Sequence, residues 1–300
     1  MAGTSDLPPG WEARTVTTEE FVKPGHVAAL AALFDDGLPA PQTGDVLPPL
    51  WHWVALAHWP LSGEMGPDGH PLRSTASFLP PVDLPRRMFA GGDVEFPGTL
   101  RVGDTVRKVS SVESVTEKQG HSGRLVIVVV VTRLYAPDGT LAVVEKQNVI
   151  YREAAVSTEQ VPAAEPAAVL TPEGPPIRRY GTDSWRLWTD PTLLMRFSAA
   201  TANPHRIHYD WPYATRVERY PGLVVHGPLM TLALAETHRL SDDPHPIAEL
   251  SHRNSAPLFC GTTAELRPTP TATGKTVAVL SRGGVGATET IHTRLDLTYA

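Results

Sequence analysis

The chain has 300 residues, of which 41% are hydrophobic and 19% charged, and its formal net charge is −6. This composition is that of a globular protein long enough to build two hydrophobic cores. The small negative charge, without any run of lysine or arginine, excludes nucleic acid as an expected partner.

The sequence carries no signal for a membrane, a disulfide or a metal. No apolar run reaches the ~18 residues that a membrane span needs, and the N-terminal residues lack the charged and apolar segments of a signal peptide. The single cysteine cannot form an internal disulfide. No spacing of His, Cys, Asp or Glu matches a metal site, and no Gly-rich loop follows a strand. We therefore expect a cytoplasmic protein without metal, cofactor or membrane partner.

The first half predicts two helices followed by an antiparallel sheet. A short helix is expected over residues 24–34, and the stretch at 50–59, apolar on all sides, predicts a buried helix. Between them lies a loop with four prolines, and the sequence MGPDGHP at 65–71 is rich in turn formers. The strands are expected at the end of 78–96 and at 100–109, 110–115, 124–133 and 141–151, with a hairpin turn at 137–139.

The second half repeats this plan. Residues 155–177 are a Pro- and Ala-rich linker, and they are followed by a helix near 190–202 and a long apolar helix at 228–239. Strands are expected at 257–266, 275–282 and 289–299. A long apolar helix followed by a sheet that wraps it is the hot-dog arrangement, so the chain predicts an α+β double hot-dog fold. The expected units are residues 1–154 and 178–300.

The candidate chemistry lies in residues 197–236. This segment holds His208 and His226 at loop-like positions, and Asn203 five residues before His208. Gly227 and a proline open the apolar helix, and the first backbone N–H groups of a helix have no partner within it. These N–H groups predict a site for an anion or an oxyanion beside the histidines.

Residues 197–210, read without gaps, resemble the motif of the MaoC-like, R-specific enoyl-CoA hydratases. On this reading the family's catalytic histidine falls on His208 and its catalytic aspartate on Asn203. The family's His-Gly pair falls on His226 and Gly227. The resemblance implies that the Gly227 N–H is the oxyanion donor.

Longer stretches are similar to the double hot-dog branch of that family, which includes mesaconyl-C4-CoA (3-methylfumaryl-CoA) hydratase, itaconyl-CoA hydratase and 3-hydroxyacyl-thioester dehydratases. These stretches are NPHRIHYDWPYA, YPGLVVHGPL, PPLWHWVALAHW and FLPPVDLPRRMFAGGDVEF. The resemblance implies hydration of an α,β-unsaturated acyl-CoA thioester, or the reverse dehydration, with a branched C5 dicarboxylic substrate as the first candidate. A dehydratase for longer or carrier-bound chains, a non-catalytic acyl-thioester-binding subunit and a thioesterase are the alternatives.

Asn203 is the departure from the family motif. An asparagine can orient a water but cannot take its proton at neutral pH. His208 must therefore act alone or borrow a carboxylate, for which Asp210, Asp93 and Glu95 are candidates.

The remaining expected contacts are with the substrate. Arginines suit a carboxylate or phosphate, so the expected substrate-binding residues are Arg86, Arg87, Arg206, Tyr209 and His226, whereas His205 is expected to be exposed. The first half is expected to shape the acyl tunnel without having a site of its own. A homodimer is expected, with a monomer as the alternative because two hot-dog units already lie in one chain.

Overall fold

The computed structural model describes residues 10–120, 123–154, 169–282 and 288–300. In the first half the strands are β1 (Thr15–Phe21), β2 (Arg86–Glu95), β3 (Thr105–Gly120), β4 (Gly123–Tyr135) and β5 (Leu141–Arg152). In the second half they are β6 (Ile177–Arg179), β7 (Trp185–Leu187), β8 (Ile247–Asn254), β9 (Ala264–Pro270), β10 (Gly274–Arg282) and β11 (Glu289–Tyr299).

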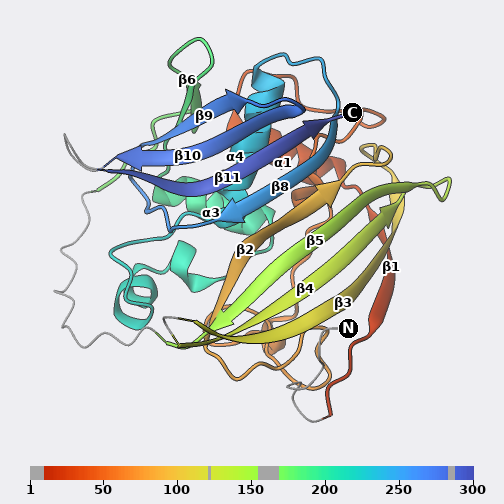
Figure 1. Ribbon diagram of the computed structural model, residues 1–300, viewed down its shortest axis with the longest axis vertical. Coiled ribbons are helices and arrows are strands. Elements are labelled where there is room, and N and C mark those ends of the chain that lie inside the picture. The colour runs from red at the N-terminus through yellow and green to blue at the C-terminus, as the bar shows by residue number, and fades with distance from the viewer. Residues whose placement is uncertain (1–9, 121–122, 155–168, 283–287) are drawn as a thin grey trace.

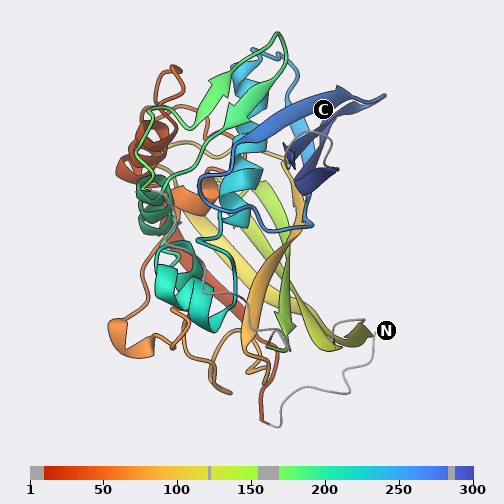
Figure 2. The same ribbon diagram turned by 90° about the vertical axis from the view of Figure 1, so that its left-hand side faces the viewer.

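The helices are α1 (Pro24–Phe34), α2 (His52–Ala55), α3 (Pro191–Ala200) and α4 (Gly227–Leu240), together with the short turns η1 (Ser62–Glu64), η2 (Arg206–His208) and η3 (Tyr213–Val217). Figures 1 and 2 show that α1, α3 and α4 lie on one side of the strands. The expected helix at 24–34 is confirmed, and that at 228–239 is confirmed to within a residue at each end.

All the strands belong to one antiparallel sheet, in the order β1-β3-β4-β5-β2-β8-β11-β10-β9-β7-β6. The two halves join where β2 pairs with β8. Gly91 permits this close approach, because a Cβ there would lie 2.1 Å from the His252 carbonyl oxygen of β8. Gly92 permits the approach of β5 on the other side of β2, because a Cβ there would lie 2.0 Å from the Lys146 carbonyl oxygen. The strand at the junction therefore has to be glycine-rich.

Helix α4 forms the filling of the second half. Ten of its residues are buried, and it contacts β9, β10, β11 and β2. An apolar helix of this kind is stable only when a sheet surrounds it. The expected apolar helix and its wrapping sheet are thus present.

The expected helix at 50–59 is wrong in length, because only His52–Ala55 is helical. Leu50 adopts a left-handed backbone with φ 68° directly after two prolines, which delays the start of the helix. Pro60 disfavours helical backbone in the residue before it. The buried Trp51 side chain instead packs across the molecule and donates its Nε1–H to Glu236 Oε2 of α4 at 3.2 Å.

The strands expected at 124–133, 141–151, 275–282 and 289–299 are confirmed, whereas those expected at 100–109 and 110–115 form one strand, β3, that begins only at Thr105 and runs to Gly120. Strands β1, β6, β7 and β8 were not expected, and the strand expected at 257–266 overlaps β9 only from Ala264. Strand β1 has no buried face, so its sequence shows no apolar alternation. Most of the expected linker, residues 155–168, lies outside the described residues.

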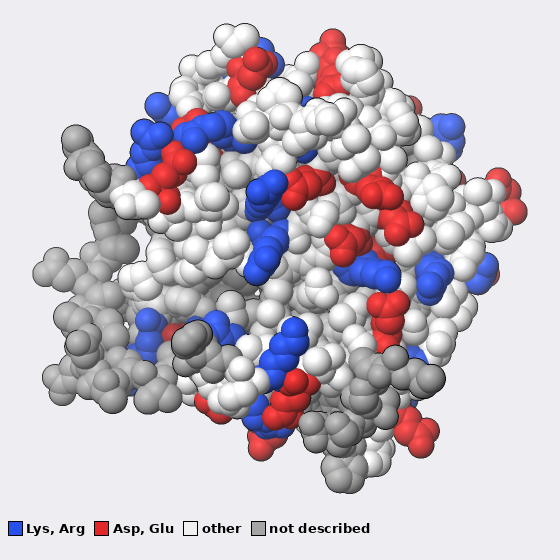
Figure 3. Space-filling model, viewed as in Figure 1, with Lys and Arg blue, Asp and Glu red and all other residues white. Residues whose placement is uncertain are grey.

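The open face of the sheet carries charges of both signs. Figure 3 shows blue and red side chains next to one another over the strands, and the ion pairs Arg294–Asp296 and Lys146–Glu113 are of this kind. Within the described ranges, no helix has the length and apolar character that crossing a membrane requires.

Candidate active site

The motif loop begins where α3 ends. Asp190 caps the start of α3 by accepting from the backbone N–H groups of Thr192 and Leu193. At the other end Ala202 takes a left-handed conformation with φ 48°, which turns the chain into the loop. The Asn203 side-chain oxygen then accepts from the backbone N–H of His205 at 3.1 Å. Asn203 therefore shapes the loop that leads to His208.

His208 is held as a neutral base. Its Nδ1 lies 2.7 Å from the Val224 carbonyl oxygen, and because a carbonyl only accepts, Nδ1 carries the proton and Nε2 is left bare. Burial lowers the pKa of His208 to about 4, against the opposing effect of this hydrogen bond. At neutral pH the Nε2 atom is thus ready to accept a proton.

His226 lies directly against His208. The two rings stack with their centroids 3.6 Å apart. Ser198 Oγ lies 2.8 Å from His226 Nε2, whereas the buried His226 Nδ1 has no partner among the described residues. Burial and then repulsion from His208 hold the pKa of His226 well below its usual value. The stacked pair is therefore uncharged.

Gly227 opens α4 beside this pair. The first backbone bond of the helix is donated by Met230 to the His226 carbonyl oxygen, and within the described residues no acceptor contacts the Gly227 N–H. A Cβ at Gly227 would lie 2.7 Å from Asn254 Nδ2. The free N–H at a helix start suits a developing oxyanion.

A loop of the first half docks on the motif loop. The backbone N–H of Arg206 donates to the Asp68 carbonyl oxygen at 3.0 Å, and Arg206 Nη1 donates to the Pro67 carbonyl oxygen at 2.8 Å. A Cβ at Gly69 would lie only 1.9 Å from the Pro204 carbonyl oxygen, and Gly69 has φ +90°. The two loops are thus in backbone contact, although about 135 residues separate them in sequence.

This docking brings two further polar residues, Asp68 and His70, to the site. His70 Nδ1 donates to Asp68 Oδ2 at 3.0 Å, and the His70 backbone N–H donates to Asp68 Oδ1 at 2.9 Å. Burial raises the pKa of Asp68, but the bonds from His70 outweigh this effect and lower it to about 2. The Asp68 side chain is therefore a carboxylate. The sequence reasoning missed this pair, although its Asp-x-His spacing within a turn was a visible signal.

His205 lies between His70 of the docked loop and the stacked pair of His208 and His226. Its ring centroid lies 4.3 Å from that of His70 and 5.6 Å from that of His208. The expectation that His205 is exposed is wrong, because the residue is only 7% exposed. Burial, followed by repulsion from the neighbouring histidines, lowers the pKa of His205 to about 2.

Two of the expected substrate-binding arginines already have partners. Arg206 pairs with Asp210 at 2.7 Å and lies over the Tyr213 ring. Arg86 pairs with Glu218 at 2.6 Å and donates to the Tyr220 hydroxyl. The fourth expected substrate-binding residue, Tyr209, lies at the surface, where its hydroxyl donates to the Pro204 carbonyl oxygen.

Arg87 is different. No acceptor among the described residues contacts its half-buried guanidinium. It lies opposite Tyr151 across the β2–β5 pair, and the buried Tyr151 hydroxyl has no partner in the described part of the chain. After burial, charge repulsion from Arg87 is the main effect that lowers the pKa of His70. Arg87 is thus a cation close to the imidazoles.

The carboxylates expected to help His208 have other partners or lie elsewhere. Asp210 accepts from Arg206 and from the backbone N–H of Tyr213. Asp93 accepts from Ser251 across the β2–β8 junction at 2.7 Å, and Glu95 is exposed on the same strand. None of the three has a recorded contact with His208.

Asp68, His70 and His205 each offer a ligand atom within 4.8 Å of the others, a spacing that could hold a metal ion. No such group was expected from the sequence, because His205 is far from Asp68 and His70 along the chain. The Asp68–His70 contact is a hydrogen bond, so a proton already occupies the space between these two atoms. The trio fits a proton-bonded network at least as well as a metal site.

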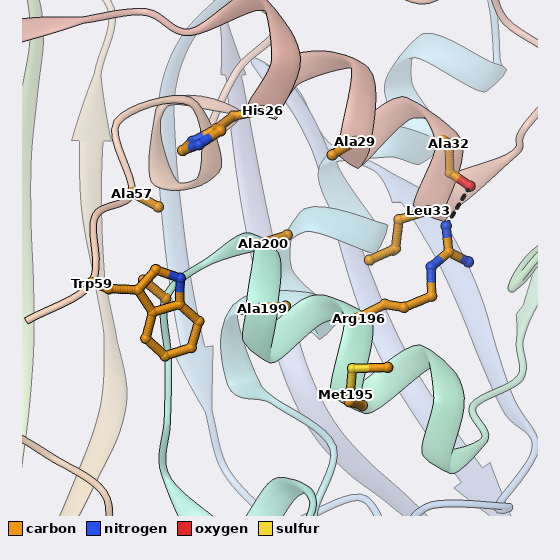
Figure 4. Close-up of a pocket in the computed structure, with 11 residues that line it drawn as sticks. His26, Ala29, Ala32, Leu33, Ala57, Trp59, Met195, Arg196, Ala199 and Ala200 are labelled. Carbon is orange, nitrogen blue, oxygen red and sulfur yellow. Dashed lines mark hydrogen bonds between the residues drawn. The ribbon is translucent and has the colours of Figure 1, made fainter. Parts of the chain in front are cut away.

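A groove of about 400 Å³ lies outside this network, between α1 and α3. Figure 4 shows Trp59 at one side of the groove, and Met195 and Arg196 at the other, where Arg196 donates a hydrogen bond to the Ala32 carbonyl oxygen. Its lining reaches Ala202, the residue before Asn203, and contains none of the histidines of the site.

Comparisons with known proteins bear on the family and the fold of the chain. The family model of hydroxyacyl-thioester dehydratase type 2 matches residues 50–260. The chain is 40% identical to mesaconyl-C(4)-CoA hydratase of Chloroflexus aurantiacus over 249 residues, which cover 83% of this chain and 84% of that protein.

Two solved structures show the same fold. HtdX of Mycobacterium tuberculosis superposes with a TM-score of 0.62 at 18% identity, covering 96% of this chain and all of that one. A second M. tuberculosis protein, described as having a double hot-dog fold, gives a TM-score of 0.54 at 14% identity and covers 96% of this chain and 95% of its own. The expected double hot-dog fold class is confirmed.

Proposed function

The chain belongs to the hydroxyacyl-thioester dehydratase type 2 family, and we propose that its single catalytic centre is the group of His208, Gly227 and Asn203 in the second half. The protein is a hydro-lyase that hydrates enoyl thioesters or dehydrates 3-hydroxyacyl thioesters. The observation that carries the assignment is the bare Nε2 of the buried His208, whose ring stacks on His226, the residue directly before the free N–H of Gly227.

The reaction follows from these groups. His208 Nε2 takes a proton from water as the water oxygen bonds to the β-carbon, and the electrons of the C=C bond move toward the thioester oxygen. The Gly227 N–H stabilises the negative charge on that oxygen, which is typically worth about 3 kcal/mol for one donor. The proton on Nε2 then passes to the α-carbon, so that H and OH have been added. Dehydration is the reverse.

We propose a dicarboxylic acyl group as the substrate. The relative acts on a mesaconyl thioester, by its name, and in the C4 thioester of mesaconate the free carboxylate is attached to the β-carbon that water attacks. The side chains that bind this free carboxylate must therefore lie beside the imidazoles. Arg87 and the Tyr151 hydroxyl meet this requirement, because they are unpaired and adjacent. Arg86 and Arg206 then have positioning roles.

The test is the loss of enoyl-thioester absorbance with mesaconyl-C4-CoA, itaconyl-CoA and crotonyl-CoA. We expect turnover of a dicarboxylic substrate that the His208→Ala change abolishes. Arg87→Gln should lower kcat/KM for the dicarboxylic substrate about 10- to 10²-fold and for crotonyl-CoA far less, since a charge-assisted bond contributes about 1.5–3 kcal/mol.

Arg294→Gln, at an exposed arginine of β11, is the matched control and should leave all rates unchanged. Full activity in His208→Ala would refute the catalytic assignment. Equal losses with all three substrates in Arg87→Gln would refute the carboxylate receptor. A preference for long or carrier-bound acyl chains would favour the alternative dehydratase role.

A further inference from the structure

The catalytic loop lacks the carboxylate that its family motif contains, and the structure offers a substitute from the other half of the chain. We propose that the Asp68–His70 pair holds the reacting water opposite His208, in place of an aspartate at position 203. This inference rests on the proposed function. It means that the first half supplies side chains that act on the reacting water, in addition to lining the acyl tunnel.

The position of the pair is fixed by backbone contacts. Arg206 binds the carbonyl oxygens of both Asp68 and Pro67, and Gly69 lies against Pro204 with no room for a side chain. The loop is also closed on itself, since the Gly66 N–H donates to the His70 carbonyl oxygen at 2.7 Å. The backbone of both loops therefore sets where the Asp68 and His70 side chains lie relative to the motif loop.

The hydrogen bonds also fix the orientation of His70. A carboxylate can only accept, so the proton lies on His70 Nδ1 and its Nε2 is bare. His70 Nε2 has no recorded partner among the described residues. The aspartate thus does for His70 what the Val224 carbonyl does for His208: both rings present an unprotonated Nε2.

His205 contacts both rings, with its centroid 4.3 Å from that of His70 and 5.6 Å from that of His208, and charge repulsion from His70 helps to lower the pKa of His208. In the proposed arrangement one water directs its two O–H groups at the two bare Nε2 atoms. His208 Nε2 accepts the proton that is transferred, and His70 Nε2 accepts the hydrogen bond of the O–H that stays with the oxygen. His70 therefore ends the reaction in the protonation state in which it began. Asp68 acts through His70 and is a positioning residue.

The main experiment compares His70→Ala with wild type using the dicarboxylic substrate. We expect kcat/KM to fall about 10²-fold, the usual size of such a contribution, and added imidazole to restore part of it. A structural role would not respond to imidazole. His245→Ala is the matched control, because His245 makes the same Asp-x-His contact with Asp243, at 2.8 Å, on an exposed surface; its activity should not change.

The second experiment examines Asp68→Ala by ¹⁵N NMR of the imidazole nitrogens. The wild-type His70 ring, assigned from its loss in His70→Ala, should be protonated at Nδ1, and removal of Asp68 should mix the two tautomers and lower kcat more than it changes KM. An unchanged tautomer would refute the positioning role of Asp68.

The outcomes separate this inference from the proposed function. The proposed function stands if wild type is active and His208→Ala is inactive. The inference nevertheless fails if His70→Ala is then fully active, or if imidazole does not restore its activity. One equivalent of tightly bound metal, with activity lost on chelation, would also overturn it, because Asp68, His70 and His205 would then be ligands. Absence of any turnover in wild type would remove the proposed function itself.

Discussion

Gly227→Ala tests whether the start of α4 must keep its position. The added Cβ would lie 2.7 Å from Asn254 Nδ2, about 0.7 Å inside an ordinary contact of 3.4 Å. Asn254 cannot simply rotate away, because it donates to the Phe89 carbonyl oxygen and accepts from the Thr293 hydroxyl at 2.8 Å. We therefore expect the helix start to move.

The effect on catalysis follows from this displacement. An oxyanion donor works at about 2.7–3.1 Å, so a shift of this size removes most of its roughly 3 kcal/mol. Because 1.4 kcal/mol corresponds to about a tenfold change, kcat should fall about 10²-fold while the N–H itself is retained. The enoyl-thioester absorbance assay measures the loss, and a thermal melt checks that the protein is folded.

The double variant decides whether the reasoning is correct. In an Asn254→Ala background the clash is absent, so Gly227→Ala should cost little further activity there. If Gly227→Ala lowers kcat equally in both backgrounds, the steric argument is wrong. If the single variant keeps its kcat and only loses stability, then the Asn254 side chain moves instead of the helix. In that case the added Cβ does not displace the Gly227 N–H.

Four further predictions concern pH and the docked loop. Hydration kcat/KM should fall as pH drops through about 4, where His208 becomes protonated, and a pH–rate profile measures this. The same depressed pKa makes folding stability fall between about pH 6.5 and 4, by about 3 kcal/mol, in denaturant titrations. Burial raises the pKa of Glu236 to about 8 despite its Arg239 partner, so stability is lost as pH rises from 4.5 through 8, and Glu236→Gln should remove this loss. Gly69→Ala should lower both activity and melting temperature, because its Cβ would overlap the Pro204 carbonyl; unchanged values would mean that the loop docks elsewhere.

The sequence predicted the parts of the fold whose pattern is local. Helix α4 is apolar around its circumference and opens with Gly-Pro, so its bounds follow from those residues. The stretch at 50–59 has the same composition, but the backbone turn at Leu50 and the demand for Trp51 against α4 override it. Strand β8 was missed because its place is set by pairing with β2 of the other half.

The candidate site divides in the same way. His208, His226 and Gly227 were found because their spacing lies within one segment of the chain. Asp68 and His70 could not be placed, since only the docking of two loops brings them near His205. Nor could the sequence distinguish Arg87 from its neighbour Arg86, because the Glu218 partner that occupies Arg86 comes from a distant turn.

The β2–β8 junction has a consequence for how the two halves can change. In a symmetric pair of identical subunits every substitution appears twice, so neither copy can specialise without altering the other. Here one polypeptide contains both units, and each accumulates substitutions independently. The two units differ accordingly: the first has the short helix α2 and the loop with the ionised Asp68, whereas the second has the long helix α4. With the single catalytic centre proposed above, such a chain carries one reaction centre where a symmetric pair would carry two.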